Sequence, residues 1–183
     1  MAGATINIIL LAVVSVATAA TCTLDSITWS CSATPHLTLK FSKVTVTECD
    51  EINTKDAFKT LLSISYTGKN IDQQGKTYTA VMVDPDAPKH ANGEAWLHWI
   101  RSGLMGKDLV DGTMLTGQDI MEYAPPTPPK ETGIHRYFVF LFEETNPVTA
   151  TKDLVRRKFH LATFAEENKL CGPVASNMFR TQY

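Results

Sequence analysis

The sequence has no excess of positive charge. Its 183 residues carry 17 Lys and Arg against 19 Asp and Glu, a formal net charge of −2 at pH 7. A surface that holds a nucleic-acid backbone needs clustered cations, and the one short basic run is Arg156-Arg157-Lys158. We interpret that run as a solvated face, and nucleic acid is not an expected partner.

Several short functional motifs are also absent. No Asn-x-Ser/Thr sequon occurs, so N-linked glycan is not expected. The lack of a Cys-x-x-Cys pair disfavours a cysteine zinc site. The lack of a Gly-x-Ser-x-Gly elbow argues against a serine hydrolase. The apolar fraction of 44% and the charged fraction of 20% are nonetheless those of an ordinary folded protein.

The N-terminal segment has the composition of a leader. It is uncharged, apolar from Ile6 to Val16, and ends in the small residues Ala17-Thr18-Ala19-Ala20. We predict that residues 1–20 are a secretory signal peptide, that residues 21–183 form a single domain, and that the protein is secreted and extracellular. A membrane anchor is the alternative. No second apolar stretch of spanning length follows, so no transmembrane segment is expected in the mature chain.

Four cysteines follow the leader, at Cys22, Cys31, Cys49 and Cys171. An even number in a chain bound for an oxidising compartment predicts two disulfide bonds. Three pairings are compatible with the sequence. We favour Cys22 with Cys31, which leaves Cys49 to pair with Cys171.

The hydrophobic pattern predicts a mostly β domain. Alternation favours a strand over residues 37–46, and β-rich runs favour strands at 61–66, 78–83, 96–100 and 137–142. Residues 123–130 include four prolines and are expected to form an extended loop. One stretch, Thr151–Asn168, is predicted to be a helix that packs on the β structure, because a threonine cap precedes apolar residues at helical spacing.

An unusual loop, Asp84-Pro85-Asp86-Ala87-Pro88, ends the predicted strand at 78–83. Its prolines fix their own φ angles and restrict the residues before them. Two carboxylates that lie close together repel each other, so one of them must take up a proton or gain a positive partner, and histidine is the natural candidate. Taken alone, the motif is better explained as a simple turn.

The first candidate histidine, His98, lies between two tryptophans. Strand alternation places Trp96, His98 and Ile100 on one face, with Leu97 and Trp99 on the other. His98 is predicted either to hydrogen-bond within the core or to line a pocket with aromatic walls.

The second candidate, His135, follows a glycine. Alternation brings His135 and Tyr137 to one face and turns Arg136 to the opposite face. Arg136 is therefore expected to be a structural ion-pair partner. An anion near His135 would be held by imidazole and phenol groups.

These motifs together resemble the phosphatidylethanolamine-binding protein family. The resemblance rests on their order and spacing: Asp84-Pro85-Asp86-Ala87-Pro88, Trp96-Leu97-His98-Trp99 and Gly133-Ile134-His135-Arg136-Tyr137. Flanking matches, among them Gly75-Lys76-Thr77-Tyr78, Pro128-Pro129-Lys130 and Pro173-Val174-Ala175, extend it from about Leu37 to Phe179.

The resemblance implies a mainly β fold, a sandwich of antiparallel Greek-key sheets with the C-terminal helix packed on it. It also implies a small pocket for phosphate-like or carboxylate-like anions, including phospholipid head groups, and no cofactor. The ligand-binding residues that it implies are Asp84, Asp86, Pro88, Trp96, His98, Pro129, His135 and Tyr137. Glu131 stands where the family usually has glycine, which we expect to place an extra carboxylate near the pocket entrance.

Three functions are compatible with these residues. The first is a secreted, non-catalytic protein that binds a small anionic or zwitterionic ligand such as a phospholipid head group. The second is an extracellular regulator or inhibitor of a protease or signalling protein, with a protein as its target. The third is a metal-dependent enzyme that would use His98, His135 and one aspartate as ligands. The first is expected, with no catalytic residue and no metal.

Overall fold

The structure, a computed structural model, describes residues 22–30, 36–114, 116–149 and 153–183. The predicted signal peptide at 1–20 lies outside the described residues. No helix within the described part of the chain is both long and apolar enough to cross a membrane.

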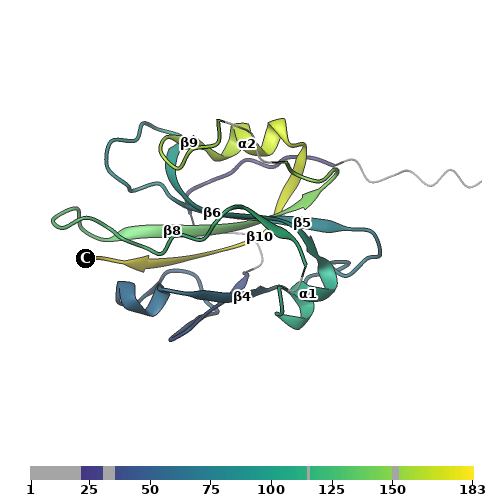
Figure 1. The fold of residues 1–183 in the computed structure, drawn as a ribbon, viewed down its shortest axis with the longest axis horizontal. Coiled ribbons are helices and arrows are strands. Elements are labelled where there is room, and N and C mark those ends of the chain that lie inside the picture. The colour runs from purple at the N-terminus through teal and green to yellow at the C-terminus, as the bar shows by residue number, and fades with distance from the viewer. Residues whose placement is uncertain (1–21, 31–35, 115, 150–152) are drawn as a thin grey trace, which may run out of the picture.

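Two β-sheets form the body of the described chain (Figure 1). The large sheet has the strand order β3-β10-β8-β5-β6-β7, with β9 paired to β6 outside this path, and the small sheet has the order β2-β1-β4. The small sheet consists of β1 (Thr38–Phe41), β2 (Thr45–Val46) and β4 (Leu61–Ser65). The large sheet consists of β3 (Glu51–Ile52), β5 (Thr77–Asp84), β6 (Glu94–Met105), β7 (Gln118–Met121), β8 (His135–Glu144), β9 (Phe159–His160) and β10 (Leu170–Thr181). The helical elements are a 3₁₀ turn at Lys55–Phe58, α1 (Gly106–Asp111) and α2 (Leu161–Glu167).

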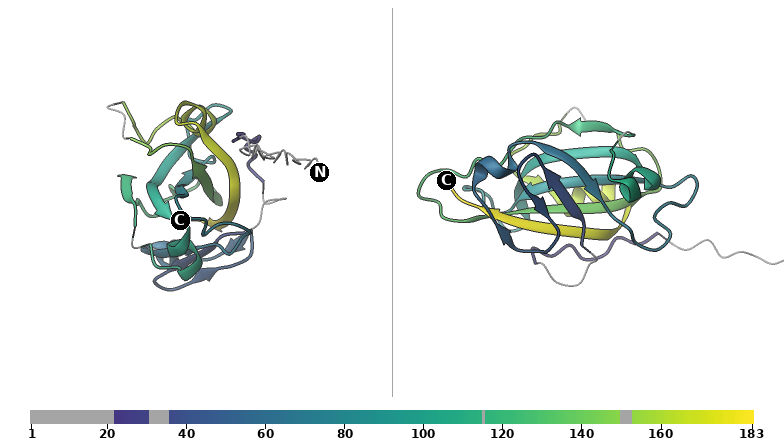
Figure 2. Two further views of the ribbon diagram at one scale, coloured as in Figure 1. Left: turned by 90° about the vertical axis from the view of Figure 1, so that its right-hand side faces the viewer. Right: turned by 90° about the horizontal axis from the view of Figure 1, so that it is seen from below.

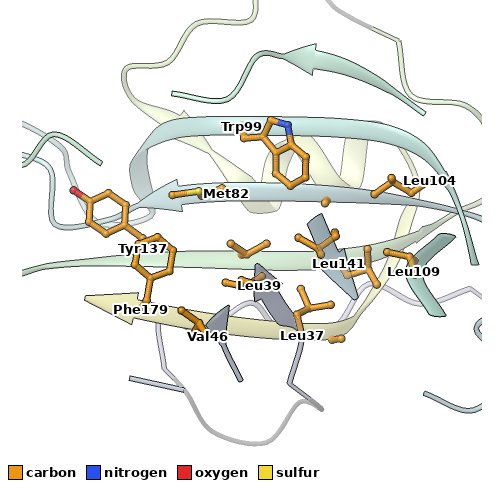
Figure 3. Close-up of a cluster of buried hydrophobic side chains, with 14 of the residues drawn as sticks. Leu37, Leu39, Val46, Met82, Trp99, Leu104, Leu109, Tyr137, Leu141 and Phe179 are labelled. Carbon is orange, nitrogen blue, oxygen red and sulfur yellow. The ribbon is translucent and has the colours of Figure 1, made fainter. Parts of the chain in front are cut away.

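The large sheet is covered on both faces. The small sheet lies against one face and α2 lies over the other (Figures 1 and 2). Between the two sheets, Leu39, Trp99, Tyr137 and Phe179 belong to one buried cluster (Figure 3). A second cluster, which includes Phe140 and the α2 residues Leu161 and Phe164, fills the space under the helix. Burial on both faces explains why β5 and β8 are nearly continuous hydrophobic runs.

The predicted mainly β fold with a C-terminal helix is confirmed, but two of its elements are placed differently. The predicted strand at 37–46 is two antiparallel strands, β1 and β2, which a tight turn joins with a hydrogen bond from Phe41 N to Val44 O of 2.8 Å. The longest strand that the sequence did not reveal is β10. It contains Gly172 and Pro173, and the register with β8 shifts between Cys171 and Ala175, where proline does not need to donate to the ladder.

The prediction of a helix over Thr151–Asn168 was wrong in its first half. In the described residues α2 begins only at Leu161, and Phe159–His160 pairs with β6 instead. The Arg156 guanidinium donates to the carbonyl oxygens of Leu97, His98 and Glu122, at 3.1, 2.9 and 2.8 Å. The arginine thus ties this segment to β6 in an irregular path of turns, which is why Arg156 does not lie on a solvated helix face.

The favoured disulfide pairing was also wrong. Cys22 is bonded to Cys171, with 5.3 Å between their Cα atoms, and not to Cys31. The N-terminal segment runs beside the start of β10, where Gly172 N donates to Thr23 O at 2.9 Å, and this pairing brings the two cysteines together. Cys49 is disulfide-bonded as well, and Cys31 lies outside the described residues.

Candidate ligand-binding site

A cavity of about 420 Å³ opens where β5 ends and β8 begins, and its volume falls in the range of small-molecule sites. Seven of the eight residues predicted to bind the ligand line it: Asp84, Pro88, Trp96, His98, Pro129, His135 and Tyr137. The structure therefore brings residues from four separate stretches of chain to one pocket. Whether they bind a ligand stays a prediction.

A β-bulge in β6 sets the direction of His98. Met82 of β5 pairs with Trp99, but the next residue, Val83, pairs with Leu97, so His98 is the extra residue between them. Leu97 therefore packs in the cluster under α2 while Trp99 packs between the sheets. The predicted common face of Leu97 and Trp99 was wrong, because the bulge interrupts the alternation. His98 and Trp96 both line the pocket.

Asp84 and His135 form a buried ion pair at the pocket. His135 Nδ1 lies 2.8 Å from Asp84 Oδ2, and their side chains are 1% and 4% exposed. His135 Nε2 lies 2.8 Å from the Thr132 hydroxyl, which donates its only proton to the Pro129 carbonyl at 2.8 Å. Both ring nitrogens therefore donate, so the ring is an imidazolium. The hydrogen bond to Asp84 also raises the pKa of His135 above its usual value.

This pairing makes stability depend on pH. Because the pKa of His135 is higher in the folded state, its stabilisation is fully present below the unfolded pKa of about 6.5 and is lost as pH rises through the folded-state value. As pH rises from about 6.5 to the folded-state pKa of His135, we expect the free energy of unfolding to fall more steeply in the native protein than in a His135→Gln variant. Urea unfolding across this range provides the measurement, and identical pH profiles for the two proteins would contradict the imidazolium.

Asp86 does not line the pocket, in contrast to its predicted place there. Its carboxylate accepts hydrogen bonds from Arg136 Nε and Nη2 at 2.8 and 2.6 Å, and from the Arg136 backbone N–H at 2.9 Å. Burial opposes ionisation, but these hydrogen bonds hold the pKa of Asp86 below its usual value. The expected repulsion between Asp84 and Asp86 is thus relieved by a separate cation for each.

His98 is held differently from His135. Its Nδ1 lies 2.7 Å from the carbonyl oxygen of Ala124, in the proline-rich loop, and its ring meets Tyr137 edge to face at 5.2 Å. Burial lowers the pKa of His98. Burial and the nearby Asp84 carboxylate raise the pKa of Tyr137, so its hydroxyl stays protonated. That hydroxyl is buried and interacts with the Asp84 carboxylate.

Five further residues line the pocket and were not predicted from the sequence: Ala87, Lys89, Thr127, Pro128 and Arg157. Lys89 and Arg157 are exposed side chains, so they supply positive charge at the solvent side of the pocket. The basic run at 156–158 was the available signal, but only the attachment of Arg156 to β6 shows that its neighbour reaches the site.

Glu131 lies beside this pocket but does not line it. It lines a neighbouring hollow with Lys130 and Tyr183, and its φ of 64° lies in the left-handed region that favours glycine. Among the described residues no three His, Cys, Asp or Glu side chains are grouped so that they could hold a metal ion.

Comparisons with known proteins identify the family. The family model of the phosphatidylethanolamine-binding proteins matches residues 34–179. This chain belongs to the phosphatidylethanolamine-binding protein family. The resemblance inferred from the three motifs is thereby confirmed.

Proteins that are similar to this chain carry different names. A Drosophila melanogaster protein named "Putative odorant-binding protein A5" is 30% identical over 115 residues, a match that covers 58% of this chain and 52% of that protein. The chain thus matches about half the length of this relative. The phosphatidylethanolamine-binding protein of Plasmodium vivax superposes with a TM-score of 0.63 at 21% identity, covering 80% of this chain and 84% of that one. A carboxypeptidase Y inhibitor, solved in complex with its proteinase, gives 0.61 at 19% identity, covering 80% and 82%.

Proposed function

We propose that this family member is a secreted, non-catalytic protein that binds a small ligand, such as a phosphoethanolamine-like head group or another small anion. The observation that carries the proposal is a cavity of about 420 Å³ that combines aromatic walls with convergent polar groups. Small-molecule sites typically have this composition and size. The description of the Drosophila relative as an odorant-binding protein supports a role in binding small ligands.

The charges at the pocket fit a ligand that carries an anionic group. Lys89 and Arg157 are exposed cations on its lining, and the Asp84 carboxylate is neutralised by the His135 imidazolium. An anion therefore meets positive charge at the solvent side and no uncompensated carboxylate inside. Trp96, Pro88 and Pro129 offer apolar surface to the rest of the ligand.

Two features support secretion. The leader composition of residues 1–20 predicts export, and the disulfide between Cys22 and Cys171 is of the kind that persists in oxidising compartments.

Filling the pocket is expected to weaken binding. Ala87 lines the cavity, so an Ala87→Trp variant places an indole in it without removing a polar group. We expect its affinity for phosphoethanolamine, measured by calorimetry, to fall by at least about tenfold, which corresponds to 1.4 kcal/mol. Phosphoethanolamine should also be recovered unchanged after prolonged incubation with the native protein.

The matched control is Ala91→Trp, at an exposed position four residues further along the same loop that does not line the pocket. It should bind like the native protein. Equal affinities of the two tryptophan variants would place the ligand elsewhere, and no binding to the native protein would contradict the proposed ligand.

A further inference from the structure

The inner wall of the pocket presents a hydrogen-bond acceptor. His98 is 3% exposed, and its Nδ1 lies 2.7 Å from the Ala124 carbonyl oxygen. Because a carbonyl oxygen only accepts, Nδ1 must carry a proton. The bond to Ala124 is the one hydrogen bond of the His98 ring to a described residue, so Nε2 has none, and the ring lines the pocket. In the neutral ring this nitrogen therefore has a lone pair with no protein donor.

The surroundings of His98 favour the neutral ring. The Arg156 guanidinium is hydrogen-bonded to the carbonyl oxygen of His98 itself at 2.9 Å, and the His135 imidazolium lies on β8, which β5 separates from β6 in the sheet. Both cations repel a second positive charge. The Asp84 carboxylate would attract a positive charge on His98, but Asp84 is already paired with His135. The neighbouring Tyr137 hydroxyl is neutral, because burial and Asp84 raise its pKa.

We propose that His98 makes this pocket select ligands whose inward polar group donates a hydrogen bond to Nε2, as a hydroxyl or the ammonium of phosphoethanolamine does. This inference rests on the proposed binding function and adds the chemical class of the ligand group that lies at the inner wall of the pocket. An anionic group of the same ligand then lies toward the solvent side, near Arg157 and Lys89. A fully deprotonated carboxylate or phosphate pointing inward would face the lone pair of Nε2, so it binds there only by taking up a proton.

A pair of ligands that differ only in the polar group tests this selection. Hexanol donates a hydrogen bond at every pH, whereas hexanoate is ionised at neutral pH and only accepts. We expect hexanol to bind with a pH-independent affinity and no net proton uptake. Hexanoate is expected to take up about one proton, and its affinity to fall about tenfold per pH unit, because the binding-competent protonation state becomes rarer. Calorimetry in two buffers of different ionisation enthalpy measures the proton number.

A substitution at His98 links the effect to this side chain. In His98→Gln the amide can turn an N–H group toward the pocket, so hexanoate should bind without proton uptake. The matched control is His90→Gln: His90 also contacts a backbone carbonyl through Nδ1, that of Ala87 at 2.8 Å, but it does not line the pocket. His90→Gln should keep the hexanoate proton uptake of the native protein.

Nitrogen NMR of the imidazole rings tests the same point without a ligand and without a variant. His98 should remain the neutral Nδ1–H tautomer from about pH 6 to 8, whereas an unperturbed histidine side chain is half-protonated near pH 6.5. An imidazolium or an Nε2–H tautomer in that range overturns the inference.

Binding of hexanoate at least as tightly as hexanol, with no proton uptake, also overturns it. That result leaves the proposed binding function intact, because a ligand is still bound in the pocket that Ala87→Trp blocks. If neither these probes nor phosphoethanolamine binds the native protein, the proposed function itself fails.

Discussion

Replacing Asp84 with alanine is expected to lower the free energy of unfolding by about 3–5 kcal/mol, the usual cost of removing one partner of a buried ion pair. Asp84 and His135 are almost fully buried, so the His135 charge would lose its partner where contact with water is small. The Asp84 Oδ1 atom also accepts a hydrogen bond from the Asp86 backbone N–H at 2.8 Å, and this bond holds the turn that begins the pocket wall. The variant therefore loses both an ion pair and a local backbone restraint.

Asp86→Ala is the matched control two residues away. Its side chain and that of Arg136 are 26% and 38% exposed, so water can solvate the arginine after the substitution. We expect a loss of about 1–2 kcal/mol for this pair, less than that at Asp84. Chemical denaturation of both variants at pH 6 and pH 8 measures the difference. Equal losses in the two variants would show that the buried pair is no more costly to break than the exposed one.

The features that the sequence predicts well are those set by local pattern. β5 and β8 are continuous apolar runs because both of their faces are covered, and this signal survives without knowledge of their neighbours. Alternation along β8 is regular, so it places His135 and Tyr137 at the pocket and Arg136 away from it. The family resemblance then predicts which loops meet at the pocket.

The features that it predicts poorly depend on contacts between distant segments. The bulge at His98 is a shift in the register between β5 and β6. Nothing in the local sequence of β6 marks it. The sequence of the loop does not distinguish Asp84 from Asp86. The hydrogen bonds from Arg136 of β8 hold the Asp86 side chain away from the pocket. The non-helical path of residues 153–160 follows from the bonds of Arg156 to β6, which override helix propensity.

The disulfide is the clearest case of a long-range feature. The sequence favours the nearby partner Cys31 for Cys22, but the bridge joins residues 149 positions apart. Proximity in sequence is a poor guide here because the segment before β1 pairs with the start of β10. The chain is thus closed into one large loop that contains nearly the whole described domain.

Opening this loop is expected to produce the other large loss of stability. In the chain-entropy model, a bridge that closes a loop of this length stabilises the folded state by about 4–5 kcal/mol, because it restricts the unfolded chain. The Cys22→Ser/Cys171→Ser double variant should lose this amount in urea unfolding under non-reducing conditions. The yield of folded protein at physiological temperature should fall with it.

A thermodynamic cycle separates the bridge from packing. Each single variant, Cys22→Ser or Cys171→Ser, already opens the same bridge, so each should lose nearly as much stability as the double variant. Cys22 is exposed and Cys171 is 9% exposed, so a loss due to packing would appear mainly at Cys171. A small effect at Cys22 with a large one at Cys171 would therefore mean that burial of the Cys171 side chain, and not closure of the loop, stabilises the start of β10.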